Sequence, residues 1–475
     1  MTESLCSTVF QPSFGSFSNI FGRKPVVLIA LVFFLVGAIV SGTSTNLPTL
    51  LIGRSIQGVG GGGIITLIEI IITDLIPLRL RGQYFGLIGS MLGIGSAIGP
   101  LLGAGCSERV SWRWIFYINL PFIGGALVLV PLCLRVLFTP KSVRMQLLRY
   151  DYVGTFLFIT STVSFLTPLT WGGVMYPWQS FRTLVPLCIG AAGFIAFIIY
   201  DIYAAADPLI PMSIFGSPTA MISYFGAVVH GFAIWCLLYY FPFYFEAVKE
   251  YSPVLAGVSL FPILLTLAPS AVVCGRLITK TGRYQLAIWA GWTISALGMG
   301  LLSRVKADTS TLGCVFLMLI PGLGLGILFP GVIVAVQASA TPGQLPIAVA
   351  MCSFFRSFGQ SIGVAIGGAV FQNRMRANIL TYPALASHAD DYSKNAAEVV
   401  HIVRECPDAM MKRDLQIAYS DSLRTVWAVC CAVLGCSMFL SAFTQEYDLN
   451  RAMQDGPEST DEGVSGGEQS RDKAM

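Results

Sequence analysis

The stretch from Gly82 to Gly105, GQYFGLIGSMLGIGSAIGPLLGAG, indicates both the class of protein and how its helices pack. It has no charged residue, and as a helix it would cross the roughly 30 Å hydrocarbon core of a bilayer. Gly95, Gly99 and Gly103 recur every four residues and therefore lie along one side of that helix. Pro100 removes a backbone donor among them. We expect a helix that a neighbour approaches closely and that bends at the proline, although the spacing alone also fits an ordinary small-residue contact.

The whole chain has the composition of a polytopic membrane protein. Of its 475 residues, 55% are hydrophobic and 11% are charged, and the mean hydropathy is +0.72, whereas soluble domains are about 25% charged. The apolar segments are long and continuous, unlike the short alternating strands of a membrane β-barrel. Twelve predicted spans lie near residues 25–43, 48–73, 82–105, 114–135, 150–172, 183–205, 217–243, 253–274, 285–303, 311–335, 346–371 and 423–443.

The distribution of basic residues predicts the orientation of these spans. If the chain enters the membrane at Pro25 from the cytoplasm, Lys and Arg are more frequent in the short inner loops than in the outer ones. Both termini then lie in the cytoplasm. Most of the 12 cysteines fall within apolar segments and are predicted to pack as small side chains, but Cys106 and Cys406 lie near the outer face, where they could pair.

The spans group into two bundles. Residues 1–135 form the first, 136–215 a basic inner loop with two extra spans, 216–443 the second bundle with a polar outer loop at 373–422, and 444–475 an acidic tail expected to be disordered in the cytoplasm. The spacing Gly-x6-Gly-Arg begins at Gly15 and again at Gly275, both between two spans at one predicted face. This recurrence indicates the internal duplication from which many transporters are built.

The N-terminal segment is shorter than a span. Residues 5–18 are moderately apolar but contain serines, a glutamine and a proline, and they fall short of the roughly 20 residues that a span needs. We therefore expect only the second half of a helix before the basic turn at Gly22.

Few ionisable side chains fall within the predicted spans, and each is a candidate for function. Arg54, in LLIGRSIQGVGGGG, is expected to face a partner inside the bundle, beside Gln57 and Gly58, rather than snorkel toward water. Glu69 either titrates during transport or, as we favour, is an interfacial acid. His230 is the one histidine at membrane depth, and it either is hydrogen-bonded structure or binds the proton.

The second bundle contributes the remaining candidates. Arg356, in CSFFRSFGQSIGVAIGG, is its one deep base. The candidate substrate-cavity residues are Trp235, Tyr240, Tyr244 and Gln337. Interfacial anchoring explains membrane aromatic residues equally well, so the alternative for these side chains stays open.

Taken together, these motifs resemble the major facilitator superfamily, in particular the fungal fourteen-span drug:proton antiporters. The run from Gly15 to Lys24 is similar to the inner-loop gating motif, Arg54 to Gly58 to the fourth-span motif, and Gly95 to Gly105 to the antiporter motif. The inner-loop residues are Gly15, Asn19, Gly22, Arg23 and Lys24. The implied fold is all-α, with two pseudo-symmetric helical bundles, two intervening helices, about 12 full spans and an N-terminal half-span.

The chain departs from that family in three places. Asn19 occupies a position where the family usually has Asp, so a charge interaction is expected to be weaker, and Ala104 follows Gly103 where Gly-Gly is common. The family's first span, which commonly bears an acid, has no counterpart, and we expect it to be missing together with the start of the second.

The resemblance implies proton-coupled export of small organic molecules, such as drugs, toxins or secondary metabolites, by alternating access between the bundles. It implies a monomer in the bilayer of the plasma membrane, or of the vacuole, with protons and an organic substrate as partners. Two rivals are vacuolar transport of basic amino acids and a non-transporting sensor or inactive truncated remnant. An enzyme is disfavoured because the sequence offers no nucleophile-base pair or metal-ligand cluster, and we expect no cofactor and no nucleic-acid partner.

Overall fold

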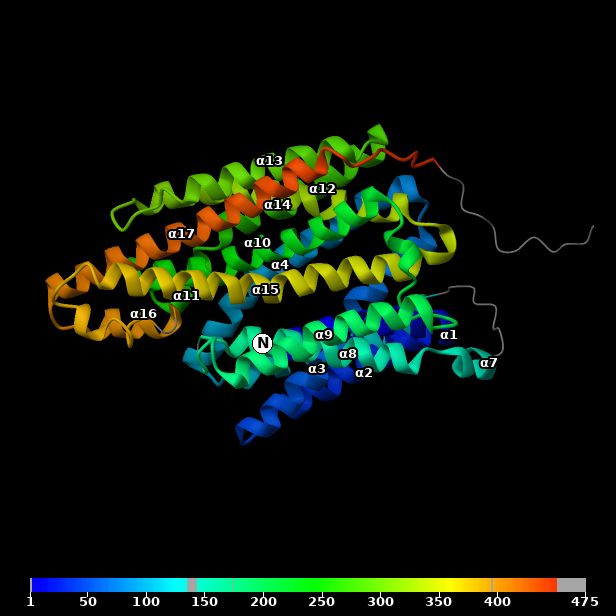
Figure 1. Cartoon of the computed structure of the whole chain (residues 1–475), viewed down its shortest axis with the longest axis horizontal. Helices are drawn as coiled ribbons and strands as arrows, with labels where there is room; N and C mark the ends of the chain where they lie inside the picture. Colours follow the sequence, from blue (N-terminus) through cyan, green and yellow to red (C-terminus); the bar gives the residue numbers. More distant parts are fainter. Residues whose placement is uncertain (1, 135–142, 174, 394–395, 451–475) are drawn as a thin grey trace, which may run out of the picture.

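The computed structural model describes residues 2–134, 143–173, 175–393 and 396–450, and this part of the chain is helical (Figure 1). Its long helices are α1 (Thr2–Phe21), α2 (Arg23–Gly42), α3 (Leu47–Leu75), α4 (Leu78–Arg109), α6 (Asn119–Cys133), α8 (Tyr152–Trp171), α9 (Phe181–Tyr203), α10 (Pro218–Val248), α12 (Phe261–Thr281), α13 (Gln285–Leu302), α14 (Thr311–Ser339), α15 (Leu345–Ile379) and α17 (Ala409–Ser441). The short ones are α5 (Trp114–Tyr117), α7 (Val143–Arg149), α11 (Pro253–Val258) and α16 (Ala396–Glu405).

The length and apolarity of these helices confirm a membrane protein. Within the described residues, 12 helical stretches are long and apolar enough to cross a bilayer. Several run beyond the predicted apolar segments, because polar residues at their ends pair with neighbouring helices. For example, Asn378 near the end of α15 donates to the hydroxyl of Ser422 in α17 at 3.0 Å. The non-spanning chain between these two helices is therefore shorter than the predicted outer loop 373–422, and it contains α16.

The helices form two groups that meet along α4 and α15. Figure 1 shows α1, α2 and α3 on one side of α15, and α10, α12, α13, α14 and α17 on the other. Helix α15 packs against α1 and α3 of the first group, while α4 packs against α12 and α14 of the second. These two helices therefore carry the contacts between the bundles.

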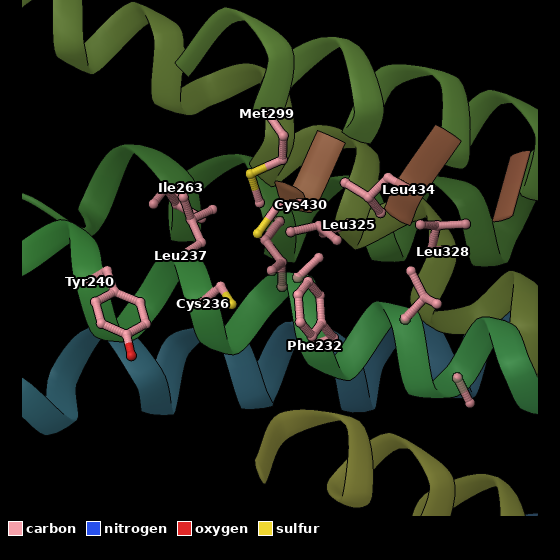
Figure 2. Close-up of a cluster of buried hydrophobic side chains, with 14 of the residues drawn as sticks. Phe232, Cys236, Leu237, Tyr240, Ile263, Met299, Leu325, Leu328, Cys430 and Leu434 are labelled. Carbon is pink, nitrogen blue, oxygen red and sulfur yellow. The ribbon is translucent and has the colours of Figure 1, made fainter. Parts of the chain in front are cut away.

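Apolar burial is concentrated in the second group. Its core extends from α10 through α12, α14 and α17, and Figure 2 shows part of it, where Phe232 and Cys236 of α10 lie near Leu325 of α14 and Cys430 of α17. A smaller core joins α1, α2, α3 and α6 around Phe14.

Helix α1 is longer than the half-helix expected from residues 5–18. It runs for 20 residues, packs against α3 and α15, and is not among the 12 apolar stretches. Its low hydropathy has a structural reason, because its polar side chains face the protein interior. Gln11 is fully buried and donates to the hydroxyl of Ser357 in α15 at 3.0 Å, and the buried Ser18 donates to the carbonyl of Gly15.

The extra helices α8 and α9 pack against each other and attach to the second bundle through phenylalanines. The ring of Phe158 in α8 lies 5.0 Å from that of Phe354 in α15, and Phe165 stacks on Phe358 at 5.9 Å. Aromatic pairs of this kind stabilise packing beyond their buried area.

The C-terminal tail begins as ordered chain rather than as the disordered segment predicted from residue 444. Tyr284 donates to the carbonyl of Gln445 at 2.7 Å, and Gln285 to that of Thr444 at 2.6 Å, so this stretch is held against the start of α13. The rest of the predicted tail, 451–475, lies outside the described residues. Cys106 and Cys406 are free thiols, so the pairing that their positions allowed is not formed.

Candidate functional site

A buried ion pair joins the two bundles. Glu69 of α3 accepts from the guanidinium of Arg356 in α15, with Nη1 3.2 Å from Oε1, and their side chains are 1% and 9% exposed. The Ser353 hydroxyl, one turn before Arg356, donates to the other carboxylate oxygen. Both donors lie on one face of α15, as residues three apart do on a helix. Glu69 is therefore not the interfacial acid that the sequence favoured.

Arg356 and His230 both lie close to one phenylalanine. The Arg356 guanidinium carbon is 4.2 Å from the ring centroid of Phe329 in α14, a cation–π contact, and the His230 ring is 6.2 Å from the same ring. Nε2 of His230 is 3.0 Å from the carbonyl oxygen of Leu325, which can only accept a hydrogen bond, so Nε2 carries a proton and donates it to this contact. Nδ1 has no hydrogen-bond partner in the described part of the chain.

Arg54 has an acid partner that the sequence reasoning missed. Its guanidinium pairs with the carboxylate of Glu3 at the start of α1 and donates to Gln57 Oε1 at 3.0 Å. It also lies 5.5 Å from the ring centroid of Phe116. The Arg54 and Glu3 side chains are 32% and 28% exposed, so this pair is half-buried.

The fourth-span motif is explained by this contact. A Cβ at Gly58 would lie 2.3 Å from the carbonyl oxygen of Glu3, so only glycine lets α1 come close enough for Glu3 to reach Arg54. Arg54 and Glu69 are fifteen residues apart on α3, roughly 22 Å of helix rise, so the two arginine–glutamate pairs lie at opposite ends of the helix.

The inner-loop motif holds the turn between α1 and α2. Arg23 Nε is 2.7 Å from Asp74 Oδ2 at the end of α3, and Arg23 also donates to Asn19 Oδ1 at 2.7 Å. Asn19 therefore still binds the arginine, while Asp74 supplies the negative charge. Lys24 donates to the carbonyl of Pro131 in α6 at 2.7 Å.

Three glycines of the repeated Gly-x6-Gly-Arg spacing stand where a residue with a Cβ would not fit the backbone or its neighbours. Gly22 and Gly282, the second glycine of each copy, have φ of +86° and +72°, a region that residues with a Cβ rarely adopt. Gly15 lies against α15, where a Cβ would be 2.9 Å from that of Ala350.

The antiporter-motif glycines do not make the close contact that their spacing predicted. Within the described residues, a Cβ added at Gly95, Gly99 or Gly103 would meet nothing within 4 Å. The close approach occurs earlier in α4, where a Cβ at Gly86 would lie 2.5 Å from the carbonyl oxygen of Ala271 in α12. Pro100 of the motif packs against α11, with its Cβ 3.2 Å from a Cβ built at Gly257.

The structure gives the four predicted cavity residues different surroundings. Tyr240 lines a cavity of about 180 Å³ between α8, α10 and α15, and its hydroxyl donates to the carbonyl of Val364 at 2.6 Å. Tyr244 is buried and donates to the carbonyl of Lys306, and Trp235 is 36% exposed. Gln337 instead links the bundles, because it accepts from Arg81 of α4 at 3.3 Å.

Comparisons with known proteins give the family. The family model described as Major Facilitator Superfamily matches residues 2–364. The chain belongs to the major facilitator superfamily. It is 49% identical over 449 residues to MFS transporter L2 of Phoma sp., covering 94% of this chain and 75% of the relative. It is 34% identical to efflux pump FUS6 of Gibberella moniliformis, with coverages of 94% and 80%, and 36% identical to the MFS-type efflux pump LUC4 of Fusarium sp., with coverages of 92% and 78%.

Among solved structures, this major facilitator is similar to the human organic anion transporter MFSD10 (TETRAN). The TM-score is 0.59 at 16% identity, and the match covers 92% of this chain and 82% of that one. At this identity the likeness concerns the fold. The family and the relatives' names confirm that the chain is a transporter rather than an enzyme.

Sequence reasoning on this transporter assigned no role to Glu3, Asp74 or Ser353. The sequence did contain a signal for the Glu69–Arg356 pair. An acid and a base that both lie deep in membrane spans are expected to pair, because each then neutralises the charge of the other. No such signal existed for Glu3, because α1 was expected to be incomplete.

Proposed function

We propose that this major facilitator exports small organic molecules in exchange for protons, and that Glu69 is the group that takes up the proton. Two relatives named efflux pumps support export. The observation that carries the coupling is the Glu69–Arg356 pair, because it joins α3 of one bundle to α15 of the other.

The coupling follows from the electrostatics of burial. In the arrangement seen here, the Arg356 guanidinium and the Ser353 hydroxyl compensate the Glu69 carboxylate. When the bundles rock apart, the carboxylate loses both partners. An uncompensated buried charge costs several kcal/mol, which binding a proton or admitting water avoids. Protonation of Glu69 therefore favours the separated state, and loss of that proton favours the closed pair.

The proton gradient supplies enough free energy for such a cycle. Moving one proton across a membrane provides about 2.3 kcal/mol per 100 mV, and each pH unit adds about 1.4 kcal/mol. We place the transporter in the plasma membrane. The excess of basic residues in the predicted inner loops supports an orientation with both ends in the cytoplasm.

The cavity beside Tyr239 and Tyr240 suits an apolar or weakly polar substrate. At about 180 Å³ it is smaller than the roughly 300–1,000 Å³ of most ligand pockets, so we expect it to enlarge when the bundles separate. A basic amino acid is a poorer candidate, because the deep acid Glu69 is already neutralised by Arg356.

The test is transport by the purified protein in vesicles with an imposed pH gradient. Export of a panel of apolar fluorescent dyes is followed together with the internal pH. The wild type should export at least one dye only with the gradient, and Glu69→Gln should abolish the gradient dependence. Asp308→Asn is the matched control, because Asp308 is 79% exposed and pairs with Arg413 on the surface.

Two results would contradict the proposal. One is gradient-driven export that survives in Glu69→Gln, and the other is wild-type export that ignores the gradient. Lysine uptake would favour the amino-acid transporter instead, and dye binding without flux would favour a sensor.

A further inference from the structure

A second cavity, unrelated to the site above, opens on the outside of the second bundle. It has a volume of about 880 Å³, with walls from α12 and α13 and with Leu323 and Ile327 contributed by α14. Its wall residues include Leu265, Leu277 and Leu286, which are 67%, 54% and 56% exposed. Such exposure is expected of a surface that contacts hydrocarbon, so we call this cavity the lipid groove.

One end of the lipid groove is basic. Arg283 lines it, directly after Gly282 in the turn that joins α12 to α13, beside the hydroxyl of Thr281. No acidic residue is among the described residues that line the groove. In the described part of the chain no ion pair engages Arg283, nor Lys280 and Arg276 in the last two turns of α12.

These two properties together match one kind of molecule. Apolar walls several helical turns long accommodate acyl chains, while an uncompensated guanidinium at the end of a membrane helix attracts a phosphate. We propose that the lipid groove binds one anionic phospholipid, with its phosphate at Arg283 and its acyl chains between α12 and α13. The nearby Lys280 and Arg276 favour a headgroup with net negative charge over a zwitterionic one. This proposal does not depend on proton coupling or on Glu69.

The test measures lipid binding to the full-length protein in detergent by native mass spectrometry. The probes are phosphatidylglycerol, phosphatidylcholine and the soluble headgroup analogue glycerol 3-phosphate. We expect one phosphatidylglycerol to bind at least tenfold more tightly than phosphatidylcholine, and glycerol 3-phosphate not to compete at equal concentration, because it lacks the acyl chains.

Two variants separate the two parts of the proposed site. Arg283→Gln should weaken phosphatidylglycerol binding about tenfold and phosphatidylcholine binding less, because the choline cation already offsets the phosphate of phosphatidylcholine. Ala290→Phe, which places an aromatic ring in the apolar part of the groove, should weaken the binding of both lipids. Arg304→Gln is the matched control, since Arg304 is an exposed arginine just past the other end of α13.

The proposal is overturned if the two phospholipids bind equally to the wild type, or if Arg304→Gln weakens phosphatidylglycerol as much as Arg283→Gln does. Competition by glycerol 3-phosphate would also overturn it, because the groove would then contribute nothing. Dye export in vesicles tests the separate question of transport, so either proposal can fail alone.

Discussion

Helix α4 meets α12 through glycines, whereas α3 meets α15 through a buried ion pair. At the first contact, a Cβ at Gly275 would lie 2.2 Å from the carbonyl oxygen of Gly82, so the two backbones are in direct contact. At the second, Glu69 and Arg356 are held by charge and hydrogen bonds. Close backbone packing depends only on shape, whereas an ion pair also depends on the protonation of its acid. We therefore expect the glycine contact to stay closed while the charged contact opens and closes.

The largest expected effect comes from breaking the charged contact on one side. Arg356→Ala leaves the Glu69 carboxylate buried without its guanidinium and should destabilise the protein by about 3–5 kcal/mol. In the double variant Glu69→Gln/Arg356→Gln, no charge is left uncompensated, so most of that stability should return although gradient-driven export does not. Thermal and denaturant unfolding in detergent measure the difference. A double variant as unstable as Arg356→Ala would show that the charges are not what joins α3 to α15.

The glycine contact is tested by comparing two glycines of the same helix. Gly86→Leu pushes a side chain into the backbone of α12 and should cost about 1–3 kcal/mol. Gly99→Leu points into open space in the described structure and should change stability by less than about 0.5 kcal/mol. The unfolding temperatures of the two variants, each compared with the wild type, measure this difference in stability. Equal destabilisation would mean that a further helix covers the Gly95, Gly99 and Gly103 face.

A smaller effect is expected at the other arginine–glutamate pair of α3. Arg54 and Glu3 are each about a third exposed, so a double-mutant cycle with Arg54→Gln and Glu3→Gln should give a coupling free energy of about 1 kcal/mol or less. The cycle at Glu69 and Arg356 should give a larger value, because that pair is almost fully buried. Similar coupling free energies at the two pairs would show that burial does not determine how strongly each pair interacts.

The smallest effect concerns the inner-loop motif. Asn19→Asp places a second carboxylate beside Arg23, which already pairs with Asp74, and should stabilise the turn by less than about 1 kcal/mol. Asn19→Ala, which removes the hydrogen bond, is the comparison variant. Destabilisation by the aspartate would show that Asp74 alone satisfies Arg23.

The predictions that held were those that depend on one helix at a time. Twelve apolar segments and twelve membrane-length helices agree, because length and apolarity are properties of a local stretch. The glycines of α4 show where this reasoning stops. Their four-residue spacing predicted a close contact at Gly95, Gly99 and Gly103, but the close contact lies at Gly86, because that is where α12 crosses α4.

The sequence by itself therefore determined that this chain is a bundle of membrane helices of the major facilitator kind, and it indicated Arg54, Glu69, His230 and Arg356 as the ionisable groups within them. Only the tertiary structure decided which of these meet. Glu69 and Arg356 are 287 residues apart in the chain, and Glu3 reaches Arg54 because Gly58 lets α1 approach α3. The physical reason is that burial of a charge depends on every helix packed around it, and that arrangement is set by contacts between distant segments.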